Sequence, residues 1–153
     1  MTNLVNLTRE AVVEVLQFSK AKASLSDVFD DVERGDARVV ERRKSPRVAF
    51  LRVDEIDELL RRHYPFSTQV SRADDRTVTV WLNELAVYGR GATLADAAED
   101  LLDEVEAYVE EWEESLRHAP NHRQRRWWVH RLQLAGDRDE LRRVILDEGT
   151  ATT

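Results

Sequence analysis

A chain of 153 residues, 42% hydrophobic and 35% charged, can form one ordinary domain or two very small ones and is too apolar to be disordered throughout. The net charge of −7 is concentrated in residues 65–116, which hold 3 basic against 13 acidic residues, whereas residues 1–64 hold 12 of each. The lack of cysteine excludes disulfides and thiolate metal sites, and charged residues interrupt the first twenty positions, so we expect a cytoplasmic protein without a membrane span.

The first third of the chain has the pattern of a strand followed by a helix. Alternating apolar residues predict a strand near residues 11–18. Ser24 is the expected N-cap of the helix, and Gly35 marks its expected end. The apolar residues between them recur at the spacing of one helical face: Leu25, Val28, Phe29 and Val32.

A hairpin and a short helix are expected next. The valine-containing runs 37–43 and 47–53 flank a polar connection with proline at 44–46, which is typical of a hairpin. Asp54 then opens a short helix that ends before Pro65, and its expected inward residues are Ile56, Leu59 and Leu60.

The second half of the chain predicts short strands followed by a long helix. Strands are expected at 66–70, 77–82 and 86–88, with Gly89-Arg90-Gly91 read as a turn. Thr93 and Asp96 form a capping pair for a helix over 94–116 whose apolar residues make a continuous stripe.

The last part of the chain predicts two more helices. Pro120 interrupts the chain, and a helix is expected to start at Asn121 or His122. Asp137 with Glu140 caps the last helix, and residues 149–153 are expected to fray.

The first half resembles the N-terminal domain of Phd/YefM-type antitoxins over residues 11–63. The resemblance depends on the order of a strand, the helix Leu25-Ser26-Asp27-Val28-Phe29-Asp30-Asp31-Val32-Glu33-Arg34-Gly35, a strand ending in basic residues, and the strand Val48-Ala49-Phe50-Leu51. It implies a dimer that contacts operator DNA. The residues to which it assigns these contacts are Lys22, Ser24, Arg42 and Arg43, with Lys20 and Lys44 in support.

The residues themselves allow two interpretations of this basic segment. Lysines near the start of a helix and arginines at a hairpin tip can offer donors to phosphates. The alternative is an ordinary solvated turn, which the family resemblance makes the less favoured interpretation.

The second half is similar to the HicB-like antitoxin domain over residues 66–115. Strand 77–82, the segment Asn83-Glu84-Leu85 and the segment 91–100 leading into the long helix carry the similarity, although Asn83 replaces the usual proline and Asp96 the usual glutamate. This similarity implies a toxin-binding domain without catalytic activity. The extension 117–148 lies outside both patterns.

Acidic and aromatic residues suggest where a partner binds. Positions 94–116 hold ten acidic residues and no lysine or arginine, which fits either a surface for a basic partner, such as a small basic ribonuclease, or a solvated face partly neutralised by residues 117–131. Tryptophans dominate many interfaces, but Trp112 and one of the pair Trp127-Trp128 are also expected core residues. The candidate partner-binding residues are Trp81, Glu106, Glu110, Trp112, Glu113, Trp127 and Trp128.

No pattern in the sequence points to catalysis, a metal or a cofactor. His118 and His122 are separated by Pro120, and no phosphate-binding glycine loop or nucleophile motif is present. A small hydrolase therefore has no support from motifs.

We expect an α+β protein with a Phd/YefM-like dimerising and DNA-binding module at 1–64, a HicB-like toxin-binding module at 65–148 and a flexible tail at 149–153. It would neutralise a cognate toxin and repress its own operon as a homodimer or higher assembly. The alternative function is a protein–protein adaptor or immunity-type inhibitor that does not bind DNA.

Overall fold

The computed structural model describes residues 14–147 and divides the chain into two compact units, Met1–Ile56 and Asp57–Thr153. Each unit combines helices with a three-stranded sheet, which confirms the expected α+β class. The division falls inside a helix, eight residues before the boundary expected after residue 64.

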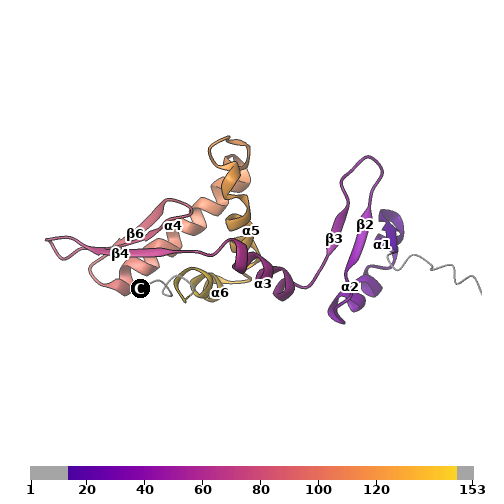
Figure 1. Ribbon diagram of the computed structural model, residues 1–153, viewed down its shortest axis with the longest axis horizontal. Coiled ribbons are helices and arrows are strands. Elements are labelled where there is room, and N and C mark those ends of the chain that lie inside the picture. Colours follow the sequence, from indigo (N-terminus) through magenta and orange to yellow (C-terminus); the bar gives the residue numbers. More distant parts are fainter. Residues whose placement is uncertain (1–13, 148–153) are drawn as a thin grey trace, which may run out of the picture. The chain divides into compact units, whose positions relative to one another are not determined.

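Unit 1 is a strand–helix–helix–strand–strand arrangement (Figure 1). β1 and β2 are parallel, with Val15 opposite Val39, and β2 and β3 are antiparallel, with Val39 opposite Ala49, which confirms the hairpin. Because β1 and β2 are parallel, the intervening helices must carry the chain back across the sheet. The elements are β1 (Val15–Gln17), α1 (Phe18–Ala23), α2 (Leu25–Glu33), β2 (Arg38–Glu41) and β3 (Val48–Phe50).

One expectation for the start of unit 1 is confirmed in part and one is wrong. The strand expected near 11–18 is β1, but it ends at Gln17 and α1 begins at Phe18; residues 11–13 lie outside the described part of the chain. Ser24 does not cap α2 with its side chain, because it also ends α1 and its hydroxyl donates to the Lys20 carbonyl, 2.9 Å away. The end of α2 is as expected, since Gly35 takes a φ of 98° there.

The core of unit 1 is small. Among the described residues it consists of four buried apolar side chains with Phe50 packed against them: Leu16, Ala21, Val28 and Val40. The apolar stripe of α2 is only partly covered, because Leu25 is 48% and Phe29 58% exposed. A surface of this kind needs another apolar surface to cover it.

α3 (Val53–His63) begins in unit 1 and ends in unit 2. Its first turn holds acidic residues and its last turn basic ones, the arrangement that the helix dipole favours. Leu60 is buried as expected, but Leu59 is 57% exposed, so its expected inward position is wrong. The helix ends at His63, before Pro65.

Unit 2 is an antiparallel meander covered on one face by a long helix (Figure 1). The strands are β4 (Thr68–Arg72), β5 (Val78–Leu82) and β6 (Val87–Gly91), and the helix is α4 (Leu94–Glu114). The side chains of Thr93 and Asp96 each bond the other's backbone N–H, which confirms the expected capping box.

The Gly89-Arg90-Gly91 segment is part of β6, so its expected role as a turn is wrong. A Cβ on Gly89 would lie 2.1 Å from the Leu101 backbone nitrogen, and one on Gly91 would lie 2.5 Å from that of Ala97. Glycine is therefore required because the backbone of α4 lies directly against the strand.

Two helices and three short helical turns complete unit 2. The expected start at Asn121 or His122 is wrong, because the turn η2 comes first and α5 begins at Arg126. Asp137 caps α6 as expected, accepting from the Glu140 N–H at 2.8 Å. The 149–153 tail lies outside the described residues. The elements are η1 (Leu116–His118), η2 (Arg123–Arg125), α5 (Arg126–Leu134), α6 (Arg138–Arg142) and η3 (Arg143–Asp147).

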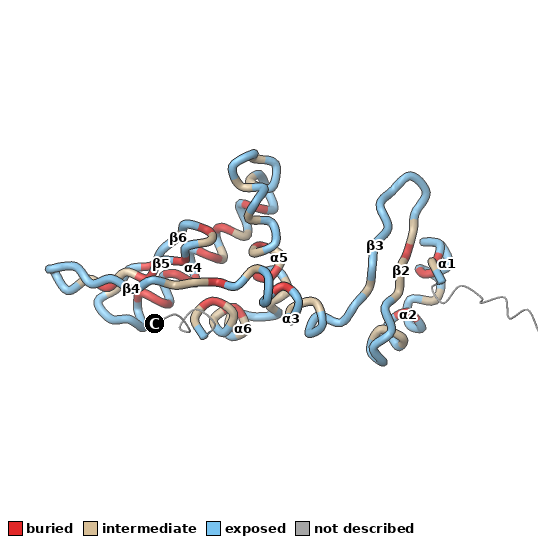
Figure 2. Tube along the Cα trace, viewed as in Figure 1, coloured by how far each residue is buried: buried red, intermediate tan, exposed pale blue. Residues whose placement is uncertain are grey.

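The core of unit 2 lies between the sheet and the helices, and Figure 2 shows its buried positions recurring along α4 and β5. Arg131 is fully buried there. Its Nη1 donates to the Tyr64 carbonyl at 3.1 Å, and its guanidinium lies 5.3 Å from the centroid of the Phe66 ring. This arginine therefore holds the segment before β4 against α5. No helix within residues 14–147 combines the length and the apolar character that crossing a membrane requires.

Candidate functional site

Basic side chains occupy the turn between β2 and β3 and the last turn of α1. Arg42, Arg43 and Lys44 are exposed in this turn, where Lys44 takes a φ of 62°. The parallel pairing places Gln17, the last residue of β1, opposite Glu41, the last residue of β2. The turn that follows β2 therefore begins beside the start of α1. The Arg42 guanidinium lies 5.3 Å from the centroid of the Phe18 ring, the first residue of α1. We call Lys20, Lys22, Arg42, Arg43 and Lys44 the basic patch.

The nearby carboxylates have partners other than Arg42 and Arg43. Glu14 pairs with Lys20 at 2.9 Å, and Glu41 accepts from Gln17 at 3.1 Å and from Arg47 at 3.0 Å. These hydrogen bonds lower the pKa of Glu41 below its ordinary value. Within residues 14–147, no ion pair joins Arg42 or Arg43 to a carboxylate. Their guanidinium groups are therefore available to an anion.

An apolar pocket of about 290 Å³ opens on the surface of unit 1. Val28, Val32 and Phe50 line it together with the more exposed Phe29 and Val53, which are 58% and 52% exposed. This pocket and the uncovered stripe of α2 form one side of the unit with little polar character.

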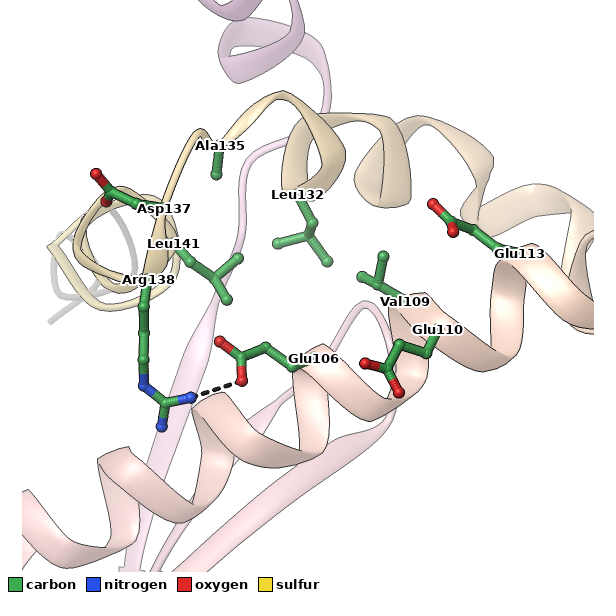
Figure 3. A pocket seen from close by; sticks show the side chains of 9 residues that line it. All are labelled: Glu106, Val109, Glu110, Glu113, Leu132, Ala135, Asp137, Arg138 and Leu141. Carbon is green, nitrogen blue, oxygen red and sulfur yellow. Dashed lines mark hydrogen bonds and ion pairs between the residues drawn. The ribbon is translucent and has the colours of Figure 1, made fainter.

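Unit 2 contains a groove between α4 on one side and α5 and α6 on the other (Figure 3). Its volume is about 380 Å³. Three of the expected partner-binding residues, Glu106, Glu110 and Glu113, project from α4 along its edge. Val109, Leu132, Ala135 and Leu141 supply apolar lining. We call this feature the acidic groove.

Arg138 closes one end of the acidic groove. Its guanidinium bonds three carboxylates of α4: Asp103 at 2.7 Å, Glu106 at 2.6 Å and Glu99 at 3.3 Å. Arg142 also pairs with Glu99. The carboxylates raise the pKa of Arg138, and the two arginines lower that of Glu99.

The sequence did not reveal this role of Arg138. The residue lies 32 to 39 positions from its acidic partners, so no local pattern connects them. The basic excess of the C-terminal segment was the one available signal, and it pointed to residues 117–131 rather than to α6.

The other end of the groove edge, at Glu110 and Glu113, is not neutralised by Arg138 or Arg142. Glu113 accepts from the side-chain amide of Gln133 at 3.2 Å. Within residues 14–147, Glu110 has no ion pair. Glu110 therefore keeps its negative charge without an ion pair in this part of the chain, whereas Glu113 also lines a neighbouring pocket with Arg117 and Arg126.

The four tryptophans occupy different surroundings. Trp112 is 4% exposed and belongs to the core, so the expected core alternative describes it. Trp128 is half-buried and donates its Nε1–H to the Pro65 carbonyl at 3.0 Å. Trp81 is 39% exposed, and its ring centroid lies 4.5 Å from that of Tyr88. Trp127 is 46% exposed and stacks on Tyr64, with 5.9 Å between the ring centroids. Trp81 and Trp127 thus remain accessible to a partner, and Tyr88 joins them as an aromatic that the sequence did not single out.

The histidines show no metal-binding arrangement. His122 Nδ1 lies 2.8 Å from the Tyr108 hydroxyl, and His118 Nε2 accepts from Arg117 at 3.1 Å. Residues 14–147 contain no group of three or more histidines and carboxylates placed to hold a metal ion.

Comparison with known families decides what kind of protein this is. The model of the PHD_like family, described as antitoxin of toxin–antitoxin, RelE/RelB, TA system, matches residues 12–147. The chain belongs to this antitoxin family. It is therefore a non-enzymatic antitoxin of a toxin–antitoxin system, and a cognate toxin is its partner. The match covers both units of the antitoxin rather than unit 1 alone.

A solved structure shares the fold of the antitoxin. It comes from Syntrophomonas wolfei subsp. wolfei and is described as the antitoxin part of a proposed toxin/antitoxin system. The two superpose with a TM-score of 0.69 over 87% of this chain and 96% of the other, at 16% identity. No curated protein matches the sequence.

Proposed function

We propose that this antitoxin represses its own operon by binding operator DNA as a homodimer through unit 1, while its HicB-like unit 2 binds and covers the toxin. The observation that carries the DNA-binding part is the basic patch, whose two turn arginines are exposed and have no ion pair within residues 14–147. An exposed guanidinium group without an ion pair can form two hydrogen bonds to a phosphate group, and no salt bridge within the protein has to break first.

The small core of unit 1 supports dimerisation. Four buried apolar side chains in the described residues provide little stabilisation for a unit of this size, and small units commonly gain it by association. The exposed apolar side chains Phe29 and Val53 beside the 290 Å³ pocket offer a surface for a second copy. A symmetric dimer would present two basic patches to the two halves of a palindromic operator.

Charge supports the division of labour between the units. The acidic groove of unit 2 would repel phosphate and attract a basic protein such as a small ribonuclease. The HicB-like resemblance of residues 66–115 points to the same role, and the exposed Trp81 and Trp127 add apolar contact area.

Fluorescence anisotropy with a labelled duplex from upstream of the operon tests DNA binding. The affinity of the wild type should fall steeply with salt. Each lost phosphate contact flattens the slope of log K against log salt by about 0.9, so Arg42→Gln with Arg43→Gln should flatten it by up to about 3.6 in a dimer. The control, Arg72→Gln with Arg76→Gln, removes the same charge from exposed positions of unit 2 and should keep the wild-type slope.

The contrary result is equally clear. Equal slopes for the wild type and the Arg42/Arg43 variant would remove the DNA-binding role. The antitoxin would then act as an inhibitor or adaptor that works by protein contact alone.

A further inference from the structure

We propose that the open half of the acidic groove is the toxin-binding site and that it takes a cationic, amphipathic segment of the toxin. An arginine or lysine of that segment would bind Glu110 and Glu113, and a neighbouring apolar side chain would cover Val109. This inference depends on the proposed role of unit 2 in binding the toxin and adds the place and the chemistry of the contact.

Five carboxylates form one continuous row along α4, and the last three of them line the groove. Their positions, 99, 103, 106, 110 and 113, follow steps of four and three, which places them on a single face of α4. Arginines of α6 neutralise the first three members of the row. The antitoxin itself therefore demonstrates that a guanidinium fits against this face.

The last two members of the row lie beyond α6. Glu113 is bonded to the neutral amide of Gln133, and Glu110 has no ion pair within residues 14–147. Both are exposed, and along α4 Glu110 lies about one helical turn and Glu113 about two turns past Glu106, the last carboxylate that Arg138 binds. A second cation can therefore bind here by the same chemistry that Arg138 uses.

The lining of the groove explains why the segment must be amphipathic. Val109 and Ala135 are half-buried, and Leu132 and Leu141 stand behind them. An apolar side chain placed over Val109 would remove this apolar surface from water, whereas a segment with charged side chains alone would leave it exposed to solvent. The carboxylates along the groove edge repel phosphate groups, so nucleic acid does not fit this site.

Binding of the full-length antitoxin to the toxin encoded beside it tests the site. Glu110→Gln with Glu113→Gln removes both charges and preserves side-chain shape. We expect the Kd to rise about tenfold, on the scale of two partly exposed ion pairs, and its salt dependence to weaken. The matched control, Glu104→Gln with Glu111→Gln, removes two exposed charges of α4 that do not line the groove, and its Kd should change by less than about twofold.

Four results would overturn the site. Unchanged binding of the Glu110/Glu113 variant would do so, and so would an equal loss in the control, because a general field rather than a groove would then attract the toxin. A change in the antitoxin's own oligomeric state on mutating Glu110 and Glu113 would identify a second copy as the occupant. Failure of the wild type to bind this toxin would remove the proposed toxin-binding role together with the site. Tryptophan fluorescence should show unchanged thermal unfolding for both variants.

Discussion

Gly89→Ala tests the packing that positions the acidic groove, because α4 carries the groove edge and lies against β6. The added methyl carbon would lie 2.1 Å from the Leu101 nitrogen and 2.2 Å from the Ala97 carbonyl oxygen. Both are backbone atoms, so no side-chain rotation relieves the clash. Strand and helix must separate by more than 1 Å to reach the ordinary contact range of 3.4–4 Å.

The cost of this separation should lie at the upper end of the overpacking range. Overpacked cores lose about 1–3 kcal/mol, and here the fully buried Ala97 and Leu101 would both shift. A loss of about 3 kcal/mol is a large part of a typical stability of about 5–15 kcal/mol. For a unit of this size it should lower the Tm by at least about 10 °C.

Thermal unfolding followed by tryptophan fluorescence measures this effect, since all four tryptophans lie in unit 2. Gly136→Ala is the control, because its new methyl would approach only the flexible end of Glu140, at 3.2 Å, and should cost less than about 0.5 kcal/mol. A Tm of Gly89→Ala equal to that of the control would refute the close contact between α4 and β6.

Two further predictions concern α4. Thr93→Ala removes the side chain that accepts the Asp96 N–H and should lower the free energy of unfolding by about 1 kcal/mol, measurable by urea denaturation; an unchanged midpoint would argue against the capping box. Hydrogen bonds from Arg142 and Arg138 lower the pKa of Glu99 below its ordinary 4.5, so this carboxylate stabilises the fold above that pH and loses its effect as the pH falls through the folded-state pKa. The wild type should therefore be more stable than Glu99→Gln at pH 7, with a difference that shrinks below about pH 4.5 in fluorescence-monitored melts; a difference independent of pH would contradict the pairing.

Local patterns were sufficient to predict the features that depend on residues close in sequence. The capping box of α4, the Asp137 cap of α6 and the Gly35 end of α2 each need only a few neighbouring residues. The hairpin between β2 and β3 was predictable for the same reason. The helical spacing of apolar residues also gave the buried face of α4.

Features that depend on distant contacts could not be predicted in this way. Gly89 resembles a turn residue in sequence, but its pairing with Val80 of β5 places it in a strand, and the backbone of α4 explains why glycine is needed there. Arg138 binds carboxylates more than thirty residues earlier in the chain. Leu59 has the spacing of a core residue, yet it is 57% exposed.

The candidate sites also combine features that depend on residues close in sequence with features that depend on distant contacts. The exposure of Arg42 and Arg43 was predictable because a hairpin tip exposes its side chains whatever packs beneath it. Glu106, Glu110 and Glu113 were predictable as one face of a helix, but the groove needs α5 and α6 as its other side. Trp112 was expected either at an interface or in the core, and its burial depends on contacts that its helix alone does not determine.

The central claim is that repression and neutralisation use separate surfaces, and cells that carry the operon promoter fused to a reporter, with the toxin induced separately, test it directly. We expect Arg42→Gln with Arg43→Gln to release the reporter while still protecting growth. Glu110→Gln with Glu113→Gln should keep the reporter repressed but require more antitoxin to protect growth. Loss of both activities in either variant, or of neither in both, would contradict the claim.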